Sequence, residues 1–226
     1  MTPMHIKCYN PDVALPHTCA KRAFAAAPAA AKDETEEIMA RQYWKGGNML
    51  YPLPAVMVSC KRPGERANII TIAWTGTVCS DPPMLSISVK PERYSYDILC
   101  ETREFVVNLV DKKNAFAMDF CGVRSGRDVD KFKEMHLHAV ASKTVSCPSI
   151  EECPVGIECA VKDIIHLGSH DMFLAEVTAV SINDAFLDEN GKFDMGSMGL
   201  VAYDHGEYFT MGDSIGRFGY SVKKSK

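Results

Sequence analysis

Apolar and polar positions alternate along residues 84–90, which is the two-residue period of a β-strand with one buried face. The apolar side comprises Leu85, Ile87 and Val89, and the polar side comprises Ser86, Ser88 and Lys90. The preceding segment, residues 67–74, is rich in β-branched side chains and is also expected to be a strand. Asp81-Pro82-Pro83 is incompatible with a helix and predicts a turn. The pattern therefore predicts a hairpin with a hydroxyl-rich loop at residues 75–80.

Similar patterns farther along the chain predict many strands and few helices. Residues 104–110 are almost continuously apolar, so we expect them to be buried on both faces of a sheet. The other expected strands span residues 53–60, 157–166, 172–182 and 198–203, with a turn at Gly168-Ser169, and the expected helices span residues 95–101, with Ser95 as N-cap, and 112–121. Strands without a strand–helix–strand rhythm predict a mainly β fold, an antiparallel barrel with a few flanking helices.

Composition agrees with one compact domain and disfavours two classes of partner. The 226 residues are 46% hydrophobic and 24% charged, which is ordinary for a globular protein. A net charge of -4 lacks the excess of Lys and Arg that neutralises nucleic-acid phosphates. No apolar run is long enough for a membrane-spanning helix. We therefore expect no nucleic-acid and no membrane partner.

The cysteines do not have the spacing of a metal site. The sequence holds 9 of them without a C-x-x-C pair. Cys60, Cys79, Cys100 and Cys159 lie in apolar surroundings, which is typical of reduced thiols that pack as small hydrophobic side chains. We therefore expect no metal, no disulfide framework and a cytoplasmic location.

Residues 1–42 differ from the rest of the chain. They contain four prolines, an alanine run and an acidic patch, with little apolar periodicity. A segment of this composition lacks the apolar face that would join a core. We interpret residues 1–42 as a flexible or loosely docked N-terminal extension and residues 43–226 as the folded domain.

A series of short motifs occurs in order along residues 43–226. The motifs are Asn68-Ile69-Ile70-Thr71-Ile72-Ala73-Trp74, Ser80-Asp81-Pro82-Pro83, Arg93-Tyr94-Ser95, Glu104-Phe105-Val106-Val107-Asn108, Cys121-Gly122, and residues 125–132, 167–171 and 212–220. Each motif is short, but their order is specific, and together they resemble the flavin reductase-like, FMN-binding split-barrel family, in particular its flavoredoxin-type members. The resemblance implies a Greek-key split barrel that binds FMN.

The resemblance also implies that the FMN phosphate lies near residues 71–95. A phosphate with about two negative charges needs hydrogen-bond donors and a cation. Hydroxyl groups, the ammonium of Lys90 and the N-terminus of the helix expected near Ser95 offer that combination. A solvated lysine at a strand end is the alternative interpretation of Lys90. The expected cofactor-binding residues are Asn68, Thr71, Ile72, Ala73, Trp74, Thr75, Ser88, Val89, Lys90, Arg93, Tyr94, Ser95, Arg127 and Lys131.

Roles for the ring and the electron donor are likewise implied by the family. Ile72, Ala73 and Trp74 are expected beside the isoalloxazine ring, with an ordinary packed aromatic as the alternative for Trp74. Arg127 and Lys131 lie in a charged segment that the family keeps near its cofactor, although surface ion pairs would look the same. His170 is the catalytic candidate, as a positioning or proton-supplying group beside the nicotinamide, unless it is simply solvated.

These expectations lead to two main hypotheses for function. The first is an FMN-binding oxidoreductase that passes electrons from NADH or NADPH to flavin or another acceptor, because hydride transfer between two rings needs no catalytic triad. With no G-x-G-x-x-G motif, the nicotinamide would bind in an open cleft over the flavin. The alternative is a flavoredoxin-type electron-transfer flavoprotein without NAD(P)H turnover of its own. A module that only carries a flavin or a haem-degradation product is a third, less favoured hypothesis.

The resemblance finally implies a homodimer with the flavin at the subunit junction. Residues 53–60, the aromatic residues Tyr203, Tyr208 and Phe209, and the glycine-rich segment 212–220 are suited to such a junction, since a twofold interface buries each patch twice. A monomer whose C-terminal segment folds over its own barrel is the alternative. The expected partners are therefore a second copy, a flavin, and a nicotinamide or a redox protein.

Overall fold

The computed structural model describes residues 41–222; residues 1–40 and 223–226 lie outside the described residues. Residues 47–222 belong to one compact unit. The interpretation of residues 1–42 as an extension therefore stays a prediction. No helix formed by residues 41–222 is long and apolar enough to cross a membrane.

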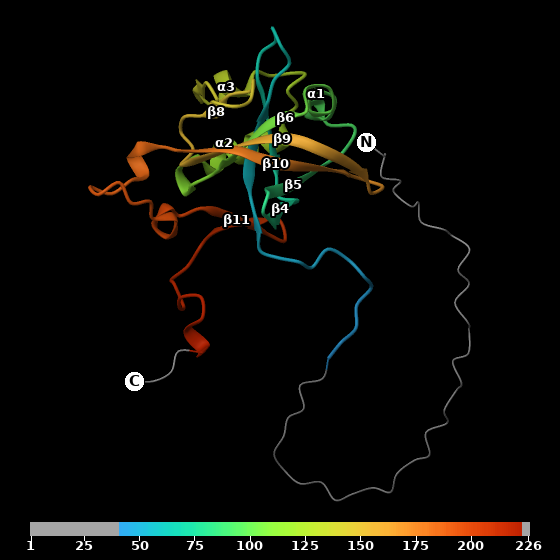
Figure 1. The fold of residues 1–226 in the computed structure, drawn as a ribbon. Helices are drawn as coiled ribbons and strands as arrows, with labels where there is room; N and C mark the ends of the chain where they lie inside the picture. The colour runs from blue at the N-terminus through green and yellow to red at the C-terminus, as the bar shows by residue number, and fades with distance from the viewer. Residues whose placement is uncertain (1–40, 223–226) are drawn as a thin grey trace, which may run out of the picture. The chain divides into compact units, whose positions relative to one another are not determined.

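Antiparallel strands dominate the unit, as Figure 1 shows. Within the described residues the main sheet has seven strands in the order β3-β2-β6-β9-β10-β5-β4, and a second sheet has three in the order β1-β11-β12. The main-sheet strands are β2 (Val56–Cys60), β3 (Asn68–Ile72), β4 (Thr75–Ser80), β5 (Pro83–Val89), β6 (Glu104–Leu109), β9 (Val155–His166) and β10 (Asp171–Ile182). The others are β1 (Leu53–Pro54), β11 (Val201–Asp204) and β12 (Glu207–Thr210), and the small pair β7 (Ala139–Val140) and β8 (Ser149–Ile150). The expected mainly β fold is confirmed.

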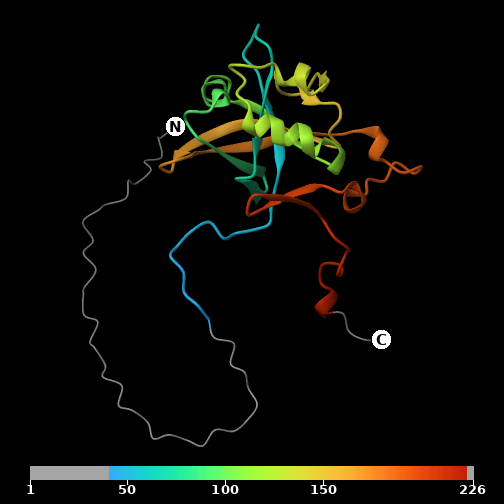
Figure 2. The ribbon, with the colours of Figure 1, turned by 180° about the vertical axis from the view of Figure 1, so that it is seen from behind.

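Short helices cover the sheets. Figure 2 shows α2 in front of the strands, where it packs against β3. The α-helices are α1 (Tyr94–Thr102), α2 (Ala115–Val123) and α3 (Lys131–Glu134), and the 3-10 helices are η1 (Lys112–Asn114), η2 (Asp184–Phe186), η3 (Met195–Met198) and η4 (Tyr220–Val222). Residues 211–222 extend from β12 away from the sheets (Figures 1 and 2).

Two apolar clusters hold these elements together. One lies between α1 and the main sheet and contains Phe105, Phe173 and Ile87, all fully buried. The other lies beneath α2 and contains Met57 and Met118. Because α1 and α2 are anchored by these clusters, the residues at the start of α1 and along α2 have fixed positions next to β3 and β5.

Three local predictions are wrong. Residues 75–80 are the strand β4, which pairs with β5 across the proline turn, because their backbone groups complete the edge of the main sheet. Residues 53–60 form two strands instead of one, since β1 pairs with β11 and β2 pairs with β3 and β6. Arg93 is the N-cap of α1, and Ser95 lies inside the helix with a buried side chain.

The seven cysteines within residues 41–222 are free thiols, and five of them are buried. Burial raises the pKa of the Cys60 and Cys121 thiols to about 11. These groups therefore remain protonated at neutral pH and behave as the small apolar side chains that the sequence predicts.

Candidate functional site

A cavity of about 510 Å³, here called the larger cavity, lies where β3, β5, α2 and the β11–β12 hairpin meet. Backbone and aromatic groups of residues 70–74 form one wall, and residues from α2 and the hairpin form the other. The lining residues are Asn48, Ala55, Ile70, Thr71, Ile72, Ala73, Trp74, Ser88, Val89, Lys90, Arg93, Asp119, Gly122, Val123, His170, Tyr203 and Tyr208. A cavity of this volume is large enough for a ligand with several fused rings.

Aromatic rings gather at one side of the larger cavity. The Trp74 and His170 rings are nearly parallel, with centroids 6.2 Å apart, and the Trp74 and Tyr203 centroids are also 6.2 Å apart. The Trp74 carbonyl accepts a hydrogen bond from the Ser88 amide over 2.8 Å, which ties the β3–β4 turn to β5. This side is therefore a fixed apolar surface suited to a flat ring.

His170 reaches the cavity from the turn between β9 and β10. Its Nδ1 lies 3.0 Å from Oγ of Ser169. Burial, followed by the positive charge of Lys90, lowers the pKa of His170 below its ordinary value. The imidazole is therefore neutral at pH 7, which fits a positioning role better than a role as a charged proton donor.

A second cavity of about 130 Å³, here called the smaller cavity, adjoins the first and shares Ile70, Arg93, Gly122 and Val123 with it. Cationic residues dominate its lining: Arg93, Arg124, Arg127 and Lys131 face only one carboxylate residue, Glu92. The remaining lining residues are Asn68, Tyr94, Ser95, Cys121, Ser125 and Gly126. An excess of positive charge in so small a space favours an anion.

Lys131 is the most unusual residue of the smaller cavity, because its side chain is 4% exposed. Its Nζ donates hydrogen bonds to the carbonyls of Ile69 over 2.5 Å and Cys121 over 2.7 Å. None of the ion pairs between residues 41 and 222 involves it. Burial lowers the pKa of Lys131 to about 8. The ammonium thus lacks a negative partner and has a third hydrogen-bond donor to spare.

The walls of the smaller cavity depend on close contacts. Nδ2 of Asn68 donates to Oγ of Ser95 over 2.8 Å. A Cβ at Gly126 would lie 2.1 Å from Oδ1 of Asn68 and 2.6 Å from the Tyr94 ring, so only glycine fits there. The Arg127 guanidinium lies over the same Tyr94 ring, 5.4 Å from its centroid. Residues from β3, α1 and the loop after α2 therefore form one packed unit.

All the cofactor-binding residues predicted from the sequence, and His170, line one of the two cavities, with the exception of Thr75. The Thr75 hydroxyl donates to the Ser86 carbonyl over 2.7 Å and so joins β4 to β5. The Thr71 hydroxyl is engaged with the Met118 carbonyl, although Thr71 does line the larger cavity. Lys90 lines the larger cavity, and the cationic smaller cavity does not include it. A phosphate in the smaller cavity would therefore contact a cation other than Lys90.

Sequence reasoning missed several lining residues. Arg124 lies between the Cys121-Gly122 motif and the motif at residues 125–132, so the sequence did indicate its position beside the smaller cavity. Asp119 is the polar residue in an otherwise apolar stretch of α2, which is a weaker signal. Asn48 lies in an irregular segment before β1 and had no signal at all.

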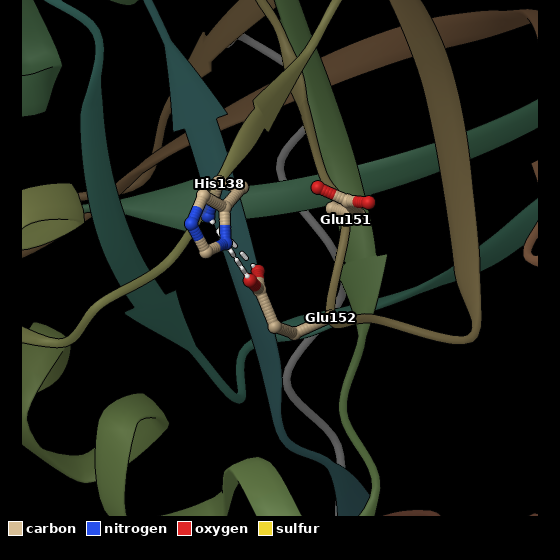
Figure 3. A group of neighbouring side chains, drawn as sticks. All are labelled: His138, Glu151 and Glu152. Atoms are coloured by element: carbon tan, nitrogen blue, oxygen red, sulfur yellow. Dashed lines mark hydrogen bonds and ion pairs between the residues drawn. The ribbon is translucent and has the colours of Figure 1, made fainter.

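Another group of potential ligands lies outside both cavities. Figure 3 shows His138, Glu151 and Glu152, whose ligand atoms lie within 4.8 Å of one another. The Glu152 carboxylate accepts hydrogen bonds from the His138 backbone amide and lies 2.5 Å from its Nδ1. These contacts account for the position of the His138 ring against Glu152.

Known proteins similar to this chain indicate its family and its fold. An uncharacterized protein of Archaeoglobus fulgidus is 30% identical over 165 residues, 73% of this chain and 91% of that protein. The flavoredoxin of Desulfovibrio vulgaris (Miyazaki F) is 25% identical with a TM-score of 0.75 over 81% of this chain and 100% of its own. An FMN-binding protein from Thermus thermophilus with bound 1-cyclohex-2-enone is 25% identical with a TM-score of 0.66, over 79% of this chain and 100% of its own.

The family assignment follows from the match along the chain. Residues 48–212 match the model of the flavin reductase like domain, and this range contains every residue that lines the two cavities. The split-barrel fold expected from the motifs is confirmed by these similar structures. The chain therefore belongs to the flavin reductase-like domain family and is a flavin-related oxidoreductase.

Proposed function

We propose that the protein binds FMN, with the isoalloxazine ring in the larger cavity and the phosphate in the smaller one. The observation that carries this proposal is the pair of adjoining cavities, one aromatic and one cationic. FMN has the same division, since a flat ring is joined to a dianionic phosphate by a flexible chain. The Thermus thermophilus relative is described as an FMN-binding protein, which supports the same cofactor.

Lys131 is the main support for the phosphate position. A buried ammonium with no carboxylate partner is costly, and an anion in the smaller cavity would lower that cost. Arg127, held over Tyr94, and Arg93 at the junction of the two cavities add further donors. The phosphate would thus be bound by side chains of α1, α3 and the loop between α2 and α3.

The ring cavity supports electron transfer. FMN supplies hydride or single-electron chemistry when bound. Trp74 and Tyr203 would cover one side of a bound ring, and the His170 imidazole lies beside Trp74 in its neutral form. These residues would orient a nicotinamide of NADH or NADPH against the ring, which is the main requirement for hydride transfer. We therefore propose an NAD(P)H-dependent, flavin reductase-like oxidoreductase.

A second candidate function is that of an electron carrier. The similarity to flavoredoxin over 81% of the chain favours it. Such a protein would hold FMN tightly and exchange electrons with a redox partner without oxidising NAD(P)H.

Anaerobic reduction separates the two candidates. The protein is reconstituted with FMN, mixed with NADH or NADPH without oxygen, and followed by the loss of flavin absorbance. Rapid loss of absorbance identifies the reductase. A flavin that stays oxidised with either nucleotide but is reduced by dithionite identifies the carrier. A protein that takes up no FMN refutes both functions.

We also propose a homodimer. Residues 211–222 extend from β12, and Ile215 and Phe218 on this segment are more than nine-tenths exposed. Phe209 on β12 is about half exposed as well. Apolar side chains in such numbers on an extended segment are suited to a surface on a second copy.

A further inference from the structure

Asp119 is the one acidic residue among those that line the larger cavity within residues 41–222. It lies on α2, one helical turn before Gly122, and its side chain is exposed to the cavity and to solvent. The ion pairs between residues 41 and 222 do not include it. The cavity wall therefore carries a negative charge that no neighbouring cation neutralises directly.

Tyr208 fixes this carboxylate in place. The phenol on β12 donates a hydrogen bond to Oδ1 of Asp119 over 2.9 Å, and the two residues are 89 positions apart. Burial and the Asp119 hydrogen bond raise the pKa of Tyr208 to about 12. The phenol is consequently protonated at neutral pH and acts there as a hydrogen-bond donor. The carboxylate is thus oriented between α2 and the β11–β12 hairpin.

The other charges of the larger cavity are positive. Lys90 and Arg93 line it, and Arg93 also lines the smaller cavity, where we place the phosphate. A bound dianionic phosphate would offset the field of Arg93, and Lys90 already has Glu92 at 3.9 Å. Asp119 has no such counter-charge, so its field acts on whatever fills the cavity.

We infer that Asp119 lowers the reduction potential of a flavin bound in the larger cavity. This inference depends on the proposed function, since the flavin must occupy that cavity. Reduction adds negative charge to the ring, and a nearby carboxylate makes this addition less favourable. When a flavin displaces water from the cavity, less solvent separates the carboxylate from the ring, so the interaction is screened less. The protein would then be a stronger reductant than the same fold with a neutral side chain at this position.

The test is a charge series at position 119, measured on protein reconstituted with FMN. The midpoint potential is determined without oxygen by equilibration with a reference dye. We expect Asp119→Asn to shift it to a more positive value, Asp119→Lys to shift it about twice as far because the charge changes by two, and Asp119→Glu to stay near the wild type. The affinities for oxidised and reduced FMN give a second readout, since only the reduced form should bind Asp119→Asn more tightly.

Asp163→Asn is the matched control, because Asp163 is an exposed carboxylate on β9 that lines neither cavity. It should leave the potential unchanged. Equal potentials in the wild type and in Asp119→Asn, both with FMN bound, would overturn this inference and leave the proposed function standing. Loss of FMN from folded Asp119→Asn would overturn it too, because the residue would then be a binding determinant. A wild type that binds no FMN would overturn both.

Discussion

Lys131 gives the sharpest test at the scale of single residues. Lys131→Met keeps most of the buried volume and removes the charge that the proposed phosphate would contact. We expect FMN binding to weaken by about 1.5–3 kcal/mol, roughly tenfold or more in the dissociation constant, because a charge-assisted hydrogen bond is lost. Titration of flavin fluorescence measures the change. Lys133→Met, an exposed lysine on the same helix, is the control. An unchanged dissociation constant for Lys131→Met would place the phosphate elsewhere.

The lowered pKa of Lys131 also predicts a pH dependence. Its pKa is about 8 in the folded protein, against an ordinary value of 10.5, because burial disfavours the charged form. The neutral amine that forms above this pKa cannot attract a phosphate, so FMN affinity should fall as pH rises through 8 and beyond. The FMN-free protein should instead become more stable over this range, since the unfolded chain binds more protons. The FMN dissociation constants of the wild type and of Lys131→Met, measured by titration at several pH values, should differ below this pKa and converge above it.

His170 is expected to affect the rate of reduction more than it affects cofactor binding. It lies beside Trp74 and lines the larger cavity but not the smaller one, where the phosphate is proposed to bind. His170→Ala should therefore slow reduction by NADH or NADPH with little change in FMN affinity. Because burial and Lys90 keep the pKa of His170 low, the wild-type rate should also be flat above neutral pH. Stopped-flow measurements decide this, with exposed His138→Ala as control. A reduction rate of His170→Ala equal to that of the wild type would show that His170 has no part in the reaction.

At the scale of elements, Asp171 connects α1 to the β9–β10 hairpin. The buried carboxylate accepts a hydrogen bond from the Tyr96 phenol over 2.5 Å, and its Oδ2 lies 2.8 Å from Nδ1 of His166. These contacts position both the N-terminus of α1, beside the smaller cavity, and the turn that carries His170. The Tyr96 hydrogen bond, followed by that of His166, lowers the pKa of Asp171 below 3.8.

Asp171→Asn should therefore lower the melting temperature at neutral pH. A carboxylate with a lowered folded pKa contributes stability above its unfolded value, and this stability is lost as pH falls through the folded pKa. The difference in melting temperature between the wild type and Asp171→Asn should consequently become smaller below pH 3.8. Tyr96→Phe should act through the same contact, so the double variant should be less destabilised than the sum of the two. Equal melting temperatures for wild type and Asp171→Asn would refute the connection.

At the scale of the whole molecule, the homodimer is testable directly. Light scattering after gel filtration should give a mass near twice the 24.9 kDa of one chain, with FMN bound. Removal of residues 211–226 should shift the protein toward the monomer, because the exposed apolar side chains of Ile215 and Phe218 would be lost. A mass near one chain for the flavin-bound full-length protein would rule out a shared site.

The local pattern of apolar, polar and turn-forming residues predicted most of the strands. The alternation in residues 84–90, the apolar run at 104–110 and the turn at Gly168-Ser169 all reappear as β5, β6 and the β9–β10 hairpin. The predictions were wrong where pairing with another strand decides whether a segment is a strand or a loop. Residues 75–80 read as a polar loop because no apolar face is present, yet they are a strand because β5 pairs with them.

The sequence by itself indicated several of the segments that surround the two cavities, because the motifs at residues 68–74, 93–95 and 125–132 can be recognised without the fold. At Gly126 the physical reason is steric, since a side chain there would overlap Asn68 and Tyr94. Only the tertiary structure decided which side chains meet. Lys131 contacts Ile69 across 62 positions, and Tyr208 contacts Asp119 across 89. Burial, a missing counter-charge and a lowered pKa are properties of such long-range contacts, and periodicity along the chain carries no information about them. The packing of distant segments, through burial and charge, therefore made Lys131 and Asp119 the residues to test.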